Sequence, residues 1–298
     1  MVHRILIVTA VAAEADSVAA GLGHDAPDSV REPAWEPVPL PGGLTLRRHT
    51  DGVDLLVGGV GPAAVAAATG TALACAALAG ADSDSDPDWG PGSSSGPGSR
   101  SSPGSAPRFR PSSGAPYDLV VSAGIAGGFA SHAPLGTVVV SEAIVAADLG
   151  AETPDGYLAV EELGFGRSAH PVPHSLTGPL AAALRAGGLP HTVAPVLTVS
   201  TVTGTAGRAA ELAGRHPTAA AEAMEGFGVA EAAAAYGVPV VEIRAVSNAV
   251  GPRDRAAWRI GEALDALRQA FALLAAPLLT PPAGPARLPN PTPSVEAK

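Results

Sequence analysis

Cysteine and lysine are almost absent from this chain of 298 residues, which has one of each, Cys75 and Lys298. A single cysteine excludes an intramolecular disulfide and a metal site built from several cysteines. Cys75 lies in an apolar, alanine-rich segment, where we expect it to act as a small buried hydrophobe. The lack of lysine among 18 basic residues indicates the coding bias of a GC-rich genome rather than a function.

Positive charge is also scarce, because 18 basic residues face 28 acidic ones and the formal net charge is -10. This balance argues against nucleic acids and anionic membranes as partners, since both repel an acidic protein. Once glycine, proline and charged residues are counted, no run predicts a membrane-spanning helix. The N-terminal run ILIV is short, β-branched and soon followed by Glu14 and Asp16, so it predicts a buried strand rather than a signal peptide. We therefore expect a cytoplasmic protein.

Apolar strand-like runs alternate with alanine-rich helical segments along most of the chain. Several of the runs are apolar on both faces, as strands buried within a sheet are. The predicted strands cover residues 4–10, 53–59, 117–124, 136–147, 194–202 and 238–247, and the predicted helices 12–22, 62–79, 178–187, 206–214, 227–236 and 255–276. This alternation predicts an α/β fold with a central mixed, mostly parallel sheet flanked by helices.

Two segments have a different composition from the rest. Residues 81–116 consist mainly of serine, glycine, proline and aspartate, which bury too little apolar surface to offset the entropy of ordering. We predict a disordered insertion there and a proline-rich flexible tail at 277–298. Too few strands precede residue 81 to close a core, so residues 1–276 are predicted to form a single domain around the insertion.

Two glycine-rich segments follow predicted strands and raise the question of a ligand. SAGIAGGF (122–129) lies between two strand-like runs, either as a tight turn or as backbone that contacts a ligand. In GGVGPAAV (58–65), Gly59, Gly61 and Ala64 match a dinucleotide-binding pattern. The acidic residue that should follow about 20 residues later would fall in the insertion. We favour a turn whose backbone borders a pocket, with a dinucleotide-dependent oxidoreductase as an alternative.

The stretch from 221 to 251 carries the most chemical information. Met224 and Glu225 precede a predicted helix, and this pair suits the apolar face and the hydroxyl groups of a sugar. Glu242 and Arg244 lie on one strand face, where we expect them to pair with each other. Glu14 follows the first strand, and its position alone fits an acid that complements a helix N-terminus.

In this order, the segments VTAVAAEAD, GGVGPAAVAAATG, SAGIAGGF, AMEGFGVA and VVEIRAVSN resemble the nucleoside phosphorylase and nucleosidase superfamily. Within it, the sequence is most similar to the futalosine hydrolases, purine nucleosidases of the alternative menaquinone pathway. The resemblance implies a small-molecule nucleoside as substrate, no metal or other cofactor, and a homodimer or larger homo-oligomer.

The resemblance also implies roles for individual residues. Glu14 would orient or deprotonate the attacking water, and Met224 and Glu225 would hold the ribose, with Glu225 bonding its hydroxyls. The other substrate-binding positions belong to a loop that passes over ribose and base: Ile125, Ala126 and Gly127. Ile125 departs from the family, in which a small hydroxyl residue is frequent.

Asn248 takes the place of an aspartate in adenine-directed relatives, and it is expected to act in both binding and catalysis. Its amide can donate to O6 and accept from N7–H, which predicts a 6-oxopurine such as the hypoxanthine of futalosine. The first turn lacks the arginine with which the phosphorylases bind phosphate, and Glu14 would repel that anion. Water is therefore the predicted nucleophile.

Several assignments remain open in the sequence. The base-stacking aromatic is Phe129, Phe165 or Phe227, and Thr201 and Thr203 are expected to be strand residues. The arginine for the distal carboxylate of the substrate is undecided among Arg167, Arg208 and Arg253, and His170 and His174 are predicted to lie in a loop along the pocket rather than to bind metal. The alternatives are a nucleosidase for methylthioadenosine or adenosylhomocysteine, a purine nucleoside phosphorylase, and a nucleoside-binding protein without catalysis.

Overall fold

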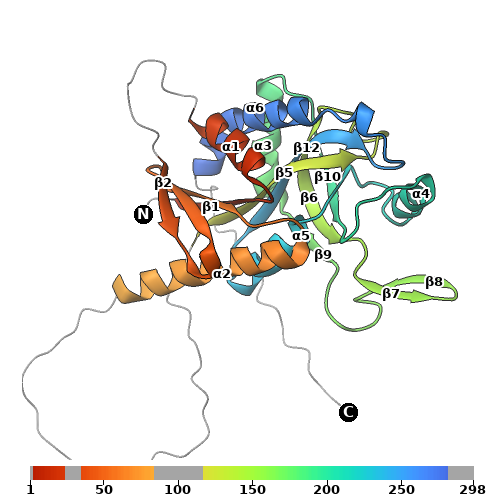
Figure 1. The fold of residues 1–298 in the computed structure, drawn as a ribbon, viewed down its shortest axis with the longest axis horizontal. Coiled ribbons are helices and arrows are strands. Elements are labelled where there is room, and N and C mark those ends of the chain that lie inside the picture. The colour runs from red at the N-terminus through yellow and green to blue at the C-terminus, as the bar shows by residue number, and fades with distance from the viewer. Residues whose placement is uncertain (1–2, 24–34, 84–116, 281–298) are drawn as a thin grey trace, which may run out of the picture.

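A mixed sheet forms the centre of the protein in the computed structural model, which describes residues 3–23, 35–83 and 117–280 (Figure 1). The sheet has ten strands in the order β11-β10-β6-β12-β5-β1-β4-β3-β2, with β9 paired to β6. The strands are β1 (Ile5–Thr9), β2 (Trp35–Pro39), β3 (Thr45–His49), β4 (Val53–Val57), β5 (Leu119–Gly128), β6 (Val138–Ala146), β9 (Ala169–Pro171), β10 (His191–Thr198), β11 (Ala221–Ala223) and β12 (Val240–Ala249). A separate hairpin consists of β7 (Gly150–Thr153) and β8 (Gly156–Ala159).

Helices cover both faces of the sheet, with α1, α3 and α6 on one side and α2 and α5 on the other (Figure 1). The bounds are α1 (Ala12–Leu22), α2 (Pro62–Ser83), α3 (His174–Ala186), α4 (Ala206–Arg215), α5 (Gly226–Ala235) and α6 (Ile260–Leu279). Short 3-10 turns lie at Pro41–Gly43 and Arg255–Ala257. The predicted α/β fold with a mixed, mostly parallel sheet is confirmed.

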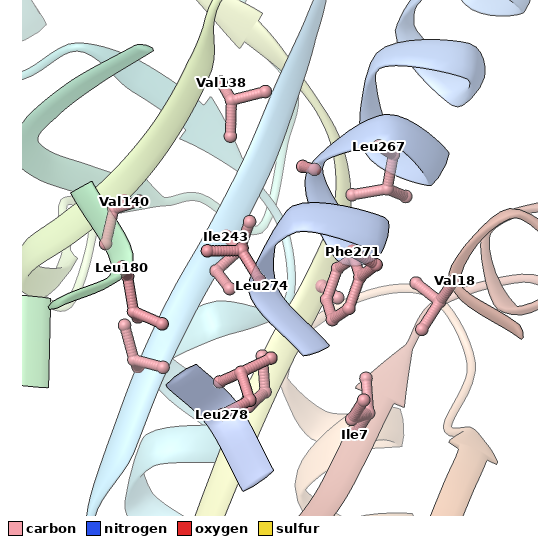
Figure 2. Close-up of a cluster of buried hydrophobic side chains, with 14 of the residues drawn as sticks. Ile7, Val18, Val138, Val140, Leu180, Ile243, Leu267, Phe271, Leu274 and Leu278 are labelled. Carbon is pink, nitrogen blue, oxygen red and sulfur yellow. The ribbon is translucent and has the colours of Figure 1, made fainter. Parts of the chain in front are cut away.

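The alternation of side chains along β1 explains why two helical layers are needed. Ile5 and Ile7 point into a core that includes Phe271 of α6, whereas Leu6 and Val8 point into a second core beneath α2 and α5. Figure 2 shows the first core, where α6 places Phe271 and its neighbours against β1, β12 and α1. A strand that is apolar at every position must bury both faces, so the sheet lies in the middle of three layers.

The carboxyl ends of several strands meet because part of the sheet closes on itself. The short strand β11 pairs with β10 in parallel and with β5 antiparallel, so β5, β12, β6, β10 and β11 form a ring. Functional groups of α/β proteins gather where parallel strands end. The same closure changes the expectation for SAGIAGGF, which is the continuation of β5 to Gly128 and not a turn or loop between strands.

Other boundaries also differ from those predicted. Helix α2 continues to Ser83, past residue 81 where the insertion was expected, and residues 84–116 lie outside the described residues. Helix α6 begins at Ile260 and reaches Leu279, so it includes the start of the predicted tail, and residues 281–298 again lie outside the described part. The peripheral strands β2, β3, β7, β8, β9 and β11 were not predicted, because most are short and only partly apolar.

Helix α2 corrects the expectation that no segment is apolar enough to cross a membrane. Among the described residues, Pro62–Ala79 is long and apolar enough to span a membrane by length and composition alone. Its mean hydropathy is 1.6, and 28% of the segment is buried. Its inner face, which includes Val65 and Leu73, packs under β1 beside α5. Helix α2 is thus part of the domain's second core. Cys75 lies on it half-buried rather than fully buried.

The contact between α1 and α6 should depend on Gly21. A Cβ at this position would overlap the main-chain oxygen of Arg268 and lie 2.9 Å from the Cβ of Phe271. Gly21→Ala should therefore lower the free energy of unfolding by about 1–3 kcal/mol through overpacking. Gly70→Ala in α2 meets nothing within 4 Å, and it should instead raise stability by about 0.5–1 kcal/mol through helix propensity. Denaturant unfolding followed by circular dichroism measures both, and equal effects would contradict the predicted packing.

Candidate active site

A cavity of about 240 Å³ lies at the carboxyl ends of β1, β5 and β12 and beside the start of α5. The residues that the sequence assigned to catalysis or to binding of ribose and base all line this one cavity, apart from the proposed stacking phenylalanines: Glu14, Ile125, Ala126, Gly127, Met224, Glu225 and Asn248. They come from four separate segments of the chain. The structure thus brings them together, and their individual roles remain proposals.

Glu14 is buried in the first turn of α1, with only 4% of its surface exposed. Its Oε2 accepts hydrogen bonds from the main-chain N–H groups of Ala10 and Val11, at 3.0 and 3.3 Å. Its Oε1 accepts from the N–H of Ile125 in β5, at 2.9 Å. Glu14 therefore complements the N-terminus of α1, as its position in the sequence indicates. The same residue also lines the cavity.

The glycines of β5 allow charged groups to come close to its backbone. A Cβ on Gly124 would lie 2.5 Å from Oε1 of Glu14 and 2.6 Å from Nη1 of Arg244. A Cβ on Gly127 would lie 3.3 Å from Nδ2 of Asn248. The small residues in SAGIAGG therefore make room for functional side chains as well as for a ligand.

Glu225 contacts the glycine-rich segment GGVGPAAV from the start of α5. It lies at the N-cap position of α5, and its Oε1 accepts a hydrogen bond of 3.1 Å from the N–H of Gly61. Gly59 and Gly61 both have φ of +92°, a left-handed conformation that favours glycine. The neighbouring Val60 lines the cavity. The preferred interpretation of GGVGPAAV, a turn that borders a pocket, is confirmed.

Arg244 is a buried cation placed among carboxylates. Its Nε donates to Oε1 of Glu242 at 2.8 Å, which confirms the predicted pair, and its Nη2 lies 3.2 Å from Oε2 of Glu225. Burial acts to lower the pKa of Arg244, but Glu242, Glu225 and Glu14 together raise it above its usual range. Burial also raises the pKa of Glu242, and the charge of Arg244 opposes that rise.

A β-bulge turns Asn248 toward the cavity. Val246 is opposite Ala126 and Asn248 is opposite Gly127, so Ser247 is an extra residue in β12. The Oγ of Ser247 lies 2.9 Å from Oδ1 of Asn248, and Nδ2 of Asn248 donates to the carbonyl of Ala249 at 3.1 Å. These contacts fix which end of the amide is the donor. Bulges commonly redirect side chains beside active sites.

Three further cavity residues were not recognised as functional from the sequence: Glu222, Thr203 and Trp258. Glu222 lies on β11, a strand of three residues. A strand of this length is too short to show an alternating apolar pattern in the sequence. Thr203 follows β10 in a loop and is not a strand residue, and the same correction applies to Thr201. Trp258 is the aromatic side chain that lines the cavity within the described ranges.

The phenylalanines proposed to stack on the base lie elsewhere. Phe129 and Phe227 are buried in the core, and Phe165 is 80% exposed, and none of them lines the cavity. Trp258 was missed because it follows a loop whose position the sequence does not predict. Indole rings combine a large apolar surface with a polar edge, which suits the rim of such a cavity.

The histidines are also placed differently from the prediction. His170 lies in β9, where its Nε2 is 2.7 Å from Oε1 of Glu231, and neither His170 nor His174 lines the cavity. Burial lowers the pKa of His170, against the opposing effect of Glu231. Within residues 3–23, 35–83 and 117–280, no group of three or more potential ligands is arranged to hold a metal ion.

The model of the phosphorylase superfamily matches residues 4–280 of the chain. A futalosine hydrolase from Streptomyces coelicolor is 53% identical over 272 residues, which cover 91% of this chain and 95% of the relative. The chain belongs to the futalosine hydrolase family of this superfamily. A second futalosine hydrolase, from Acidothermus cellulolyticus, is 42% identical over 91% of this chain and 90% of its own length. The recognised family resemblance is thus confirmed.

Solved structures share the fold of this futalosine hydrolase family member. The native futalosine hydrolase of Helicobacter pylori has a TM-score of 0.66 at 14% identity, and the alignment covers 93% of this chain and 99% of that one. A methylthioadenosine/adenosylhomocysteine nucleosidase from Colwellia psychrerythraea, in complex with adenine, has a TM-score of 0.64 at 19% identity, with 94% and 96% covered. At these identities the comparison establishes the fold alone.

Removing Arg244 should leave buried carboxylates without their cation. Arg244→Met should lower the free energy of unfolding at pH 7 by about 3–5 kcal/mol. The folded-state pKa of Glu242 should rise further. Between pH 7 and 5 the folded state should then bind more protons than the unfolded state does. The deficit should therefore shrink as the pH falls toward 5.

Denaturant unfolding between pH 5 and 8 measures this effect. The double variant Glu242→Gln with Arg244→Met should recover much of the loss. Arg208→Met, which removes the half-buried partner of the exposed Glu211, should cost about 0–1 kcal/mol with little pH dependence. A deficit in Arg244→Met that does not change with pH would contradict the buried charge cluster.

Proposed function

We propose that this chain hydrolyses the N-glycosidic bond of futalosine and releases hypoxanthine and dehypoxanthine futalosine, a step of menaquinone biosynthesis. The observation that carries this proposal is the meeting of Glu14, Glu225 and Asn248 at a single cavity. A water-directed carboxylate, a sugar-directed carboxylate and an amide suited to a 6-oxopurine are the groups that such a reaction needs. The identity to futalosine hydrolases over most of the chain supports the same substrate.

The charge of the cavity favours water over phosphate as the nucleophile. Glu14, Glu222 and Glu225 line it, and no arginine, lysine or histidine does so in the described part of the chain. The nearby Arg244 already contacts Glu225 and Glu242. A phosphate dianion would meet like charges in a site of low dielectric constant, whereas neutral water would not. This contrast supports a hydrolase rather than a phosphorylase.

The proposed reaction breaks the bond between C1′ and N9 and forms a bond between C1′ and a water oxygen. Glu14 accepts the proton that the water loses. Glu225 accepts hydrogen bonds from the ribose hydroxyls and thereby stabilises the positive charge that develops on the sugar. The electrons of the broken bond go to the purine, which leaves as the neutral base after N7 has taken a proton from solvent. Asn248 holds that protonated edge through its carbonyl oxygen.

Arg253 is the arginine best placed for the distal carboxylate of the substrate. Its guanidinium carbon lies 5.4 Å from the ring centre of Trp258, which lines the cavity, and that of Arg255 lies 5.9 Å away. By contrast, Arg167 pairs with Glu231 and Arg208 pairs with Glu211. We also propose a cytoplasmic homodimer or larger homo-oligomer, in which the exposed apolar side of α2 would be covered.

Release of free base should separate the candidate activities. The purified chain should release hypoxanthine from futalosine at the same rate with and without phosphate, and it should act more slowly on inosine and methylthioadenosine. Chromatography of the products measures the free base. A requirement for phosphate would indicate a phosphorylase, and preferred release of adenine from methylthioadenosine would indicate the other nucleosidase. No release from any nucleoside would contradict the proposal.

Glu14→Gln should leave substrate binding nearly intact and lower kcat about 10²–10⁴-fold, because an amide cannot accept the proton of the attacking water. Calorimetric titration with futalosine and steady-state kinetics measure the two effects separately. Asp16→Asn serves as the matched control, since Asp16 is exposed on the same helix and pairs with Arg47. The role of Glu14 would be refuted by a variant that keeps about a tenth or more of the normal turnover, because a general base contributes at least about 10²-fold.

A further inference from the structure

Glu222 is a buried carboxylate in the cavity for which the reaction described above has no use. Only 5% of its surface is exposed, and its neighbours on β11 are the apolar Ala221 and Ala223. We propose that Glu222 determines base specificity by accepting a hydrogen bond from N1–H of the 6-oxopurine. This inference rests on the proposed function, because it concerns the base that this site binds.

The strand register places Glu222 and Asn248 on opposite sides of one glycine. Gly127 of β5 is opposite Asn248 of β12 on one side and opposite Glu222 of β11 on the other. Two strand spacings separate the two backbones, or about 10 Å. Both side chains line the same cavity, and Gly127 has no side chain to lie between them.

This separation fits the edge of a 6-oxopurine. In hypoxanthine the carbonyl O6 lies between N7 on one side and N1–H on the other. With O6 toward Gly127 and the N7 side toward Asn248, the N1–H group lies toward Glu222. Asn248 supplies a donor for O6 and an acceptor for N7–H, and Glu222 supplies the acceptor that N1–H requires. The two residues together then satisfy every polar atom on this edge.

The hydrogen bonds of Glu222 leave acceptor capacity for a ligand. Thr203 donates to it twice, from its N–H to Oε1 at 2.8 Å and from its hydroxyl to Oε2 at 2.5 Å. A carboxylate has about four acceptor sites, so these bonds use half of them. No ion pair of Glu222 is found in the described ranges. Burial raises its pKa and the bonds from Thr203 oppose that rise, so Thr203 favours the ionised form that can accept from N1–H.

An ionised Glu222 would also reject adenine. The N1 of a 6-aminopurine carries a lone pair and no hydrogen, so it would face the carboxylate as acceptor against acceptor. A glutamine at position 222 could rotate its amide to serve either base. Glu222→Gln should therefore weaken discrimination, whereas Asn248 alone would still distinguish O6 from an amino group. Leaving a buried polar group against the wrong partner costs a factor of about 10 to 100.

The test compares futalosine with the same nucleoside carrying a 6-amino group in place of O6. In Glu222→Gln, the ratio of kcat/KM for the 6-oxo over the 6-amino substrate should fall about 10- to 100-fold. Calorimetric titration with free hypoxanthine and adenine should show a parallel change in their relative affinities. Glu211→Gln, an exposed carboxylate variant on α4, should leave the ratio unchanged.

A purely structural role of Glu222 would give a different result. If Glu222 only holds the loop at Thr203, then Glu222→Gln and Thr203→Val would reduce activity on both substrates equally, and an unchanged ratio would overturn the inference. Failure of the proposed function is a separate outcome, in which the unaltered chain releases no hypoxanthine from futalosine. In that case the relative affinity for the two free bases still tests Glu222.

Discussion

The pocket depends on one buried guanidinium that several carboxylates share. Arg244 contacts Glu242 and Glu225 directly, and its pKa also responds to Glu14. Acidic side chains at this density would repel one another and take up protons if they had no cation between them. Arg244 supplies that cation beside the cavity that Glu14 and Glu225 line. The central positions of β5 and β12 supply this arrangement, and the glycines of β5 leave room for it.

Much of the fold could be predicted because the central strands are apolar on both faces. The runs that became β1, β4, β5, β6 and β12 need two helical layers to cover them, and this need alone indicates an α/β protein. The weak point was the carboxyl end of β5, where SAGIAGGF suggested a turn or loop. The glycine and alanine residues there allow β5 to pair with both β11 and β12. The local sequence does not show that strands near residues 221 and 248 will pair with this segment.

The site was predictable where single residues follow long strands or form recognisable pairs. Glu14, Glu225 and Asn248 lie beside elements with clear periodicity, and Glu242 and Arg244 are two residues apart on one strand. Glu222, Thr203 and Trp258 were missed because a three-residue strand and two loops place them. The same limit explains the wrong choice among the phenylalanines, since only the tertiary fold shows which rings are taken up by the core.

The extra residue at Ser247 has a consequence for how related sequences can diverge. Side chains alternate along a strand, so a deletion of one residue in this part of β12 would turn the amide of position 248 away from the ligand. If Asn248 reads the base as proposed, its replacement would change the preferred purine while the backbone path stays the same. The side chain at position 248 can therefore be substituted while the bulge stays intact. An insertion or deletion in this part of β12 would instead change the direction in which that side chain points.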